Sequence, residues 1–376
     1  MRCALPRAFR RCLMGAGAEG LHVRGGSCYF MPNGVDDFDR MRIEQELPAM
    51  MPPPKPEFAA NGRASLADYV AIARPDHWVK NIFMLPGAAL ALVVDDQAGM
   101  EALPALALGV MSACLIASAN YTINEYLDGE FDRYHPTKSA RPTAQGRIKR
   151  QYVLVQYLAL IVAGLGLASL LHPVFAYAAI FLLIMGILYN VKPVRTKDRA
   201  YVDVLSESIN NPIRLVLGWA AISTIALPPS SLLLSYWMGG AYLMAMKRCA
   251  EYRMINDPAR AAKYRKSFGV YTEQSLLLSS FFYALTSVFF LGIFLIKYRI
   301  EFILSFPFFA LLFVWYQSIA LRPNSTAINP EKLYLEPKFV GYVVFLVGLV
   351  LVLFLVEIPG LKYLIDHTVA RDMRIK

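Results

Sequence analysis

Three oxygen-bearing side chains at regular spacing mark the most chemically distinctive stretch of the sequence. Asn124, Asp128 and Asp132 follow one another at intervals of four residues where a long apolar run ends, so on a helix they lie along one face. Amide and carboxylate oxygens suit Mg²⁺, which usually also takes phosphate oxygens and water. We therefore expect these three residues to bind Mg²⁺. The alternative is a solvated helix end whose charges hold no ligand.

A second polar stripe has the same spacing and opens a later apolar segment. It consists of Asp203, Glu207 and Asn211, with Arg214 close to the same face. Pro212 predicts a distorted helix, which a membrane tolerates where the backbone lines a cavity. Together the two stripes predict metal ions that bridge a diphosphate, with Asp203 and Glu207 as further metal ligands. For the second stripe alone, the alternative is hydrogen bonding between helices.

Basic residues near both stripes supply donors for phosphate, which lysine and arginine bind through charge-assisted hydrogen bonds. The residues expected to contact substrate are Arg74, Lys80, His135, Lys138, Arg141, Tyr189, Lys192, Arg214, Lys247 and Arg248. Those expected to act in catalysis are Lys80, Asp128, Asp132 and Asp203. For Arg74 and Lys80, which flank Trp78, the alternative is an interfacial belt of aromatic residues and cations. For Arg248 it is a role in membrane topology alone.

The composition is that of a membrane protein. Of the 376 residues, 56% are hydrophobic and 18% are charged, and the apolar residues occur in blocks long enough to cross a bilayer. The predicted spans are nine, at 81–95, 103–124, 151–171, 174–191, 203–222, 231–249, 275–296, 302–320 and 339–357. The expected fold class is therefore all-α, a polytopic membrane bundle.

The basic residues alternate between connections and thereby predict the orientation. Lys and Arg are frequent after the second, fourth and sixth spans, and they are absent from 95–102, 172–173 and 223–230. The positive-inside rule then places the N-terminus and the basic connections in the cytoplasm. We expect a multi-pass protein of the cell inner membrane whose active site faces the cytoplasm. Because the net charge of +10 follows this topology, no nucleic-acid partner is expected.

Three regions are expected along the chain. Residues 1–64 lack sustained periodicity and are expected to be a disordered tail, so the true start is open between Met1, Met41, Met50 and Met51. Residues 65–357 are expected to form the transmembrane domain, and 358–376 a C-terminal tail. The five cysteines show neither metal-site nor disulfide spacing.

The first stripe and its continuation resemble the signature of the UbiA intramembrane prenyltransferase superfamily. The stretch reads Asn124-Glu125-x-x-Asp128-x-x-x-Asp132 and then His135-Pro136-x-Lys138-x-x-Arg141-Pro142, with Glu125 in place of the usual second aspartate. The resemblance extends over nearly all of residues 65–357. Within the superfamily, Arg74-Pro75-x-x-Trp78-x-Lys80-Asn81 and the spacing from Asp203 to Arg214 are similar to the decaprenyl-phosphate phosphoribosyltransferase branch.

The resemblance implies a Mg²⁺-dependent transferase with a UbiA-type bundle. Members of the branch transfer 5-phosphoribose from phosphoribosyl diphosphate to a polyprenyl phosphate, on the way to cell-wall arabinose donors. The expected partners are a polyprenyl lipid substrate, a diphosphate-bearing donor and the lipid bilayer; the sequence leaves the oligomeric state open. One alternative is transfer of a prenyl group from a prenyl diphosphate to an aromatic or other small acceptor. A non-enzymatic lipid-binding or transport protein is an alternative of another class, although transport favours polar residues at mid-membrane depth.

Overall fold

The chain divides into two compact units, Met1–Phe58 and Ala59–Lys376. The computed structural model describes residues 21–24, 27–30, 64–95, 99–224, 227–298, 300–323 and 325–361. In the first unit, β1 (Leu21–Arg24) pairs antiparallel with β2 (Ser27–Phe30). This hairpin lies inside the tail that was expected to be disordered, and no pattern in the sequence indicates it. The rest of residues 1–63, and the expected C-terminal tail beyond residue 361, lie outside the described residues.

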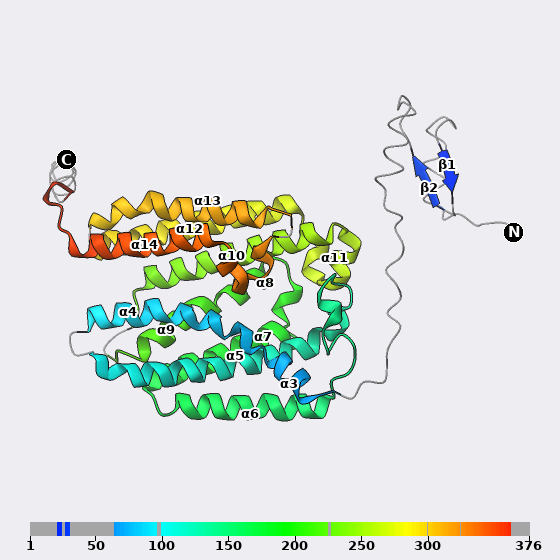
Figure 1. Ribbon diagram of the computed structural model, residues 1–376, viewed down its shortest axis with the longest axis horizontal. Helices are drawn as coiled ribbons and strands as arrows, with labels where there is room; N and C mark the ends of the chain where they lie inside the picture. The colour runs from blue at the N-terminus through cyan, green and yellow to red at the C-terminus, as the bar shows by residue number, and fades with distance from the viewer. Residues whose placement is uncertain are drawn as a thin grey trace, which may run out of the picture. The chain divides into compact units, whose positions relative to one another are not determined.

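The second unit is a bundle of helices, and its described part confirms the all-α prediction. Its main elements are α3 (Leu66–Ala73), the 3-10 helix η1 (Pro75–Met84), α4 (Leu85–Val94), α5 (Leu103–Asp132), α6 (Arg150–Ala168), α7 (Pro173–Asn190), η4 (Thr196–Asp198), α8 (Val202–Ser208), α9 (Asn210–Ala220), α10 (Ser230–Ile255), α11 (Pro258–Tyr264), η5 (Lys266–Gly269), α12 (Glu273–Tyr298), η6 (Ile300–Ser305), α13 (Phe306–Ala320) and α14 (Pro337–Leu355). Figure 1 shows the long helices side by side, with α5 and α6 at one edge and α12 to α14 at the other.

Seven segments of the described chain are long and apolar enough to cross a membrane. They are Leu66–Val94, Leu103–Asp132, Arg150–Ala168, Pro173–Asn190, Glu273–Lys297, Ile300–Ala320 and Pro337–Leu355. The first begins before the predicted 81–95 because α3, η1 and α4 follow one another directly. The predicted span 203–222 is divided between α8 and α9. The predicted span 231–249 is the continuous helix α10, whose serine, glycine and charged residues lower its mean hydropathy. The count of nine therefore stays a prediction, as does the side of the N-terminus.

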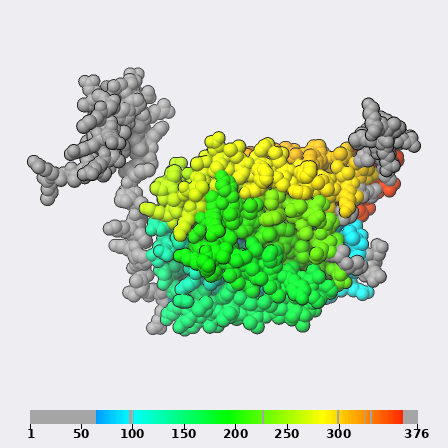
Figure 2. Space-filling view, turned by 180° about the vertical axis from the view of Figure 1, so that it is seen from behind, coloured from blue at the N-terminus to red at the C-terminus, as the bar shows by residue number. Residues whose placement is uncertain are grey.

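The outer surface of the bundle is apolar along the spans. Leu158 and Val162 on α6, Phe281 and Phe289 on α12, and Leu351 on α14 are all exposed. Figure 2 shows the rear of the unit, with α6 and α12 at opposite edges. Exposed apolar side chains in such number suit lipid rather than water. The protein is a multi-pass membrane protein.

Helices α4 and α9 approach so closely that each requires a glycine at the contact. A Cβ atom at Gly87 would lie 2.0 Å from the Leu215 carbonyl oxygen, and one at Gly218 would lie 1.9 Å from that of Met84. Small residues allow such close backbone approach between membrane helices. The contact holds η1 and α4 against α9, and both η1 and α9 contribute residues to the candidate site.

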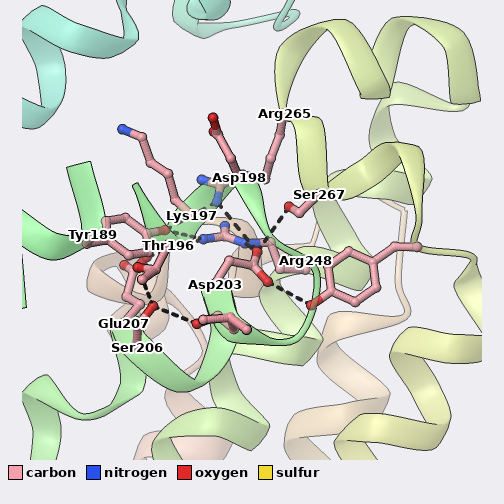
Figure 3. Close-up of polar contacts among 12 residues, drawn as sticks. Tyr189, Thr196, Lys197, Asp198, Asp203, Ser206, Glu207, Arg248, Arg265 and Ser267 are labelled. Carbon is pink, nitrogen blue, oxygen red and sulfur yellow. Dashed lines mark hydrogen bonds and ion pairs between the residues drawn. The ribbon is translucent and has the colours of Figure 1, made fainter. Parts of the chain in front are cut away.

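The connection between α10 and α12 is attached to α8 through Asp203 (Figure 3). Tyr271 Oη donates to Asp203 Oδ1 at 2.7 Å, Ser267 Oγ donates to Oδ2 at 3.2 Å, and an Arg265 nitrogen lies 3.6 Å from Oδ2. The Asp203 side chain is fully buried. Since these groups replace water around the carboxylate, its burial is tolerated, and the connection is fixed over the end of the bundle.

Replacing Gly218 by Leu is expected to destabilise the protein by about 1–3 kcal/mol or more. The new side chain would enter the space of the Met84 backbone and push α4 from α9. Equilibrium unfolding in mixed micelles measures the loss. Gly348→Leu on α14 is the matched control, because a Cβ there meets nothing within 4 Å. Equal losses in the two variants would contradict the close-contact argument.

Replacing Asp203 by Ala is expected to cost about 3–5 kcal/mol, because two guanidinium groups lose their buried counter-charge. The same unfolding measurement applies. Glu273→Ala is the control: its pair with Arg253 has side chains 46% and 42% exposed, and exposed pairs contribute about 1 kcal/mol at most. An Asp203 variant no less stable than the Glu273 variant would show that Asp203 does not hold the connection.

Candidate active site

A cavity of about 360 Å³ lies among η1, α5, α7, α8, α9 and α10. Part of its wall is apolar, formed by residues that include Ile82, Phe83, Leu182, Leu243 and Met244. Six of the residues predicted from sequence line the same cavity, namely Lys80, Asn124, Tyr189, Glu207, Arg214 and Lys247. The volume lies in the range of small-molecule sites. The structure thus brings together residues that lie more than 160 positions apart in the sequence, at 80 and 247.

Two cations of the cavity hydrogen-bond neutral groups. Lys80 Nζ lies 2.9 Å from His77 Nδ1. Arg214 Nε donates to Asn81 Oδ1 at 2.9 Å, and one of its terminal nitrogens donates to a backbone carbonyl at 3.3 Å. Lys247 joins them in lining the cavity, where Glu207 is the carboxylate present. Three cations and one carboxylate give the cavity a positive potential, which favours an anionic ligand.

Asn124 and Asp128 are joined by side chains at the end of α7 and in the turn that follows it. Asn124 Nδ2 donates to Asn190 Oδ1 at 2.5 Å, and Lys197 Nζ donates both to that oxygen at 2.8 Å and to Asp128 Oδ1 at 2.5 Å. An Arg195 nitrogen donates to Asp128 Oδ1 at 3.0 Å. Burial lowers the pKa of Lys197 to about 8, although the Asp128 carboxylate opposes this. Asp128 and Lys197 line a smaller pocket beside the cavity that Asn124 and Asn190 line.

Asn124 and Asp128 carry oxygens of the kind that a hard cation prefers, although Asp128 Oδ1 accepts hydrogen bonds from Lys197 and Arg195, with which a cation there would compete. In the part of the chain that the structure describes, no three His, Cys, Asp or Glu side chains converge as a metal-binding group. A metal ion there would need phosphate oxygens and water to complete its ligands. Asp203 fits less well, because Tyr271, Ser267 and two guanidinium groups surround it.

Arg248, predicted to bind substrate, instead lies at the centre of a buried ion-pair network (Figure 3). Its guanidinium nitrogens are 2.9 Å from Glu251 Oε2, 3.3 Å from Glu207 Oε2 and 3.4 Å from Asp203 Oδ2. The terminal nitrogen that faces Glu207 also donates to Tyr189 Oη at 3.2 Å. The charge of Arg248 is therefore balanced by carboxylates of the protein, and the residue organises the cavity wall from behind.

Three further predicted residues hold the connection that follows α5. An Arg141 nitrogen lies 2.8 Å from Asp132 Oδ2 and 3.0 Å from Glu125 Oε2. Lys138 Nζ lies 2.9 Å from Glu251 Oε1; burial opposes its charge, but Glu251 raises the pKa of Lys138. None of these residues lines the main cavity. Glu125, which departs from the family signature, is thus occupied by Arg141.

His135 organises the same connection. Its Nδ1 accepts backbone N–H groups of Thr137 at 3.2 Å and Lys138 at 3.3 Å, and its ring packs edge-on against Tyr264 at 4.7 Å. Burial, together with the nearby Lys138 charge, lowers the pKa of His135 to about 3. The ring is therefore neutral near pH 7, and its role in this structure is to shape the loop.

Arg74 and Lys192 lie away from the main cavity. Arg74 lines a separate open cavity together with Glu125 and Arg141, and Lys192 is exposed. In the basic run after α7, Lys192 is the residue predicted to contact substrate. In the structure, Lys197 and Arg195 of the same run hydrogen-bond Asp128. The run of basic residues indicated that a cation would lie near the site, but not which one. The backbone turn after α7 decides which of its members points inward.

Glu251 is a further residue of the site that was not predicted from the sequence. Its spacing from Lys247 predicts an exposed i,i+4 pair of little energetic weight. In the structure the Glu251 side chain is fully buried and lies between Lys138 and Arg248. Three carboxylates, of Asp203, Glu207 and Glu251, thereby share the buried cations, a convergence that no local pattern in the sequence indicates.

Comparison with known proteins agrees with the resemblance drawn from the motifs. The profile of the UbiA prenyltransferase family matches residues 82–336. A decaprenyl-phosphate phosphoribosyltransferase of Mycobacterium tuberculosis is 32% identical over 215 residues, which cover 56% of this chain and 68% of that protein. A protoheme IX farnesyltransferase of Alkalihalophilus pseudofirmus is 27% identical over 201 residues, which cover 52% of this chain and 63% of that protein.

A solved structure gives the same result for the fold. The structure of a UbiA homolog from Archaeoglobus fulgidus bound to GPP and Mg²⁺ superposes with a TM-score of 0.58 and covers 77% of this chain and 100% of its own. At 19% identity this likeness concerns the fold alone. The alternative of a non-enzymatic lipid-binding or transport protein is set aside by the family match. The chain is a membrane transferase that belongs to the UbiA prenyltransferase family.

Proposed function

We propose that the protein transfers 5-phosphoribose from phosphoribosyl diphosphate to a polyprenyl phosphate, such as decaprenyl phosphate, at the cytoplasmic face of the inner membrane. The observation that carries this proposal is a single cavity in which Lys80, Arg214 and Lys247 share the lining with apolar side chains. Both substrates are anionic and one has a long apolar chain, so such a cavity suits the pair. The mycobacterial relative supports the choice of donor and acceptor.

The cations divide the phosphate groups of the substrates among them. Lys80 and Lys247 would contact the diphosphate of the donor, and Arg214 would contact a further phosphate. The guanidinium of Arg214 is buried and held by Asn81, so it is already oriented before substrate binds. The apolar wall around Leu243 and Met244 would receive the first units of the lipid chain.

The reaction exchanges one C–O bond for another at C1 of ribose. The bond from C1 to the diphosphate breaks and its electron pair leaves with the diphosphate, while an oxygen of the lipid phosphate forms the new bond to C1. No strong protein base is needed, because the attacking oxygen is already anionic. Lys80 and Lys247 would stabilise the charge that develops on the leaving group.

Mg²⁺ is part of the proposal. Asn124 and Asp128 would hold it, with Glu207 as a further ligand on the cavity side, and bound Mg²⁺ would supply positive charge that neutralises the diphosphate. We assign Asp203 and Asp132 to positioning rather than to metal binding, because the first holds the α10–α12 connection and the second is paired with Arg141.

Prenyl transfer to an aromatic or other small acceptor is the second candidate. The farnesyltransferase relative favours it, and the same cations would serve a prenyl diphosphate equally well. The two functions differ in what lies beside the diphosphate, a sugar with hydroxyl groups or an allylic hydrocarbon.

The direct test is an assay with purified protein in detergent, Mg²⁺, decaprenyl phosphate and labelled phosphoribosyl diphosphate. Label is expected to enter the lipid phase in the complete reaction. When EDTA is included from the start, no label is expected in the lipid phase. A parallel reaction replaces the donor by labelled geranyl diphosphate and the acceptor by an aromatic acid. Transfer in the second reaction alone, from protein shown to be folded, would replace the proposed function by prenyl transfer.

Asp128→Ala is expected to reduce turnover by about 100-fold or more, because it removes both a proposed metal ligand and the partner of Lys197. Turnover is measured in the preceding assay, and folding by thermal denaturation. Glu130→Ala is the matched control, since it removes an exposed carboxylate from the same end of α5. Substantial turnover in the Asp128 variant, or an equal loss in both variants, would remove Asp128 from the site.

A further inference from the structure

The Asp128 carboxylate shares one of its oxygens between two cations. Lys197 Nζ donates to Asp128 Oδ1 at 2.5 Å, and an Arg195 nitrogen donates to the same oxygen at 3.0 Å. The Asp128 side chain is 17% exposed and lines the small pocket beside the main cavity, so ions can reach it. Two positive groups at one oxygen repel each other, and the carboxylate is what holds both of them there.

Lys197 also faces an amide oxygen whose direction is fixed. Asn190 Nδ2 donates to the Gly186 carbonyl oxygen at 2.9 Å, so Asn190 Oδ1 is the atom that accepts from Lys197 Nζ at 2.8 Å. A flipped amide would bring its nitrogen against the ammonium group. The ammonium group therefore lies between a carboxylate oxygen and an amide oxygen. Oxygens of these two kinds are also ligands that suit Mg²⁺ and Mn²⁺.

We propose that Lys197 is the counter-ion of Asp128 until Mg²⁺ binds, and that it then gives way to the metal ion. The ammonium group and the metal ion take the same position, facing Asp128 Oδ1 and Asn190 Oδ1, and they occupy it in turn. This inference rests on the Mg²⁺ site of the proposed function and concerns how that site is filled. Lys197 thereby stabilises the site before the metal ion arrives and lowers its affinity for the ion.

The hydrogen bonds of the two cations indicate that Lys197, and not Arg195, is the group that leaves. Arg195 is anchored elsewhere, because its Nε donates to Asp198 Oδ1 at 3.2 Å and a terminal nitrogen donates to the Asn190 backbone carbonyl oxygen at 3.2 Å. Lys197 Nζ donates to the two oxygens of the proposed metal position. A divalent ion at those oxygens would repel the ammonium group strongly, since water is largely excluded around it.

The small pocket gives the displaced ammonium group a place to move to. Lys197 and Asp128 line this pocket together with Asp198 and Lys266, and its volume is about 20 Å³. That volume is enough for one water-sized group, and an ammonium group is close to that size. Asp198 offers a second carboxylate at the pocket. Lys197 can therefore exchange one carboxylate for another without leaving the site.

Metal binding is measured on the whole protein in detergent, with Mn²⁺ as the probe. The EPR signal of free Mn²⁺ gives its affinity, and competition gives that of Mg²⁺. In Lys197→Met the affinity for both ions is expected to rise about tenfold or more, because a charge-assisted hydrogen bond no longer competes for Asp128. Lys266→Met is the matched control. It removes an exposed ammonium group from the same pocket, one that pairs with Asp198, and should change the affinity by about twofold at most.

The displacement itself is followed in the unaltered protein, through the rate at which a small reagent acetylates each lysine. The Lys197 side chain is 4% exposed in this structure, so it is expected to react slowly without a divalent ion. Saturating Mg²⁺ is expected to accelerate its reaction several-fold, as the amine moves into the small pocket. Lys192, which is exposed outside both pockets, should react at the same rate in both conditions. Peptide mass spectrometry gives the two rates from one sample.

Every other result decides against the inference. Metal affinity that is unchanged or weaker in Lys197→Met would overturn it and leave the metal site standing. An equal rise in the Lys197 and Lys266 variants would show a general effect of charge instead of displacement. A Lys197 reactivity that Mg²⁺ does not raise has the same meaning, even if the variant fails to fold. If the unaltered protein binds no Mn²⁺, with or without inorganic diphosphate, the proposed metal site fails together with the inference.

Discussion

The pairing of charges buried around Arg248 is the constraint on which this site depends. Its guanidinium lies within 3.4 Å of carboxylate oxygens from Asp203, Glu207 and Glu251, and Lys138 reaches Glu251 from the connection after α5. A buried charge without a partner is strongly unfavourable, so these groups require one another. The network therefore joins the connection after α5 to α8 and α10, and through Asp203 it also holds the connection between α10 and α12.

As a consequence of this pairing, the basic residues have two different roles: some form ion pairs within the protein, and others line the cavity. The first group consists of Arg141, Lys138 and Arg248. Each forms an ion pair with a carboxylate of the protein, which balances its charge. Lys80 and Arg214 each hydrogen-bond a neutral side chain, and with Lys247 they line the cavity, where Glu207 is the carboxylate. The ion-paired residues hold the helices and connections rigidly, and the excess of positive charge among the cavity-lining residues gives affinity for anions. The close contacts of Gly87 with the Leu215 backbone and of Gly218 with the Met84 backbone hold together the segments that supply Lys80 and Arg214.

Side-chain amides also line the cavity, in addition to the cations. Asn120 and Asn210 donate through their side-chain nitrogens to backbone carbonyl groups, and both residues line the cavity beside cations and aliphatic side chains. The proposed transfer of a sugar to a lipid requires hydroxyl groups and hydrocarbon to be accommodated in one space. The mixture of amides, cations and aliphatic side chains in this cavity meets both needs.

Periodicity and composition by themselves determined the all-α membrane fold, and the spacing of Asn124 and Asp128 indicated the family. These features are readable because an apolar span and an i,i+4 stripe are local properties of the chain. The sequence also selected six residues that do line the cavity. It could not distinguish Lys192 from Lys197, or show that Arg248 and Glu251 are paired in the interior. Which basic residue meets which carboxylate depends on turns and on contacts between distant helices, and only the tertiary structure decides them.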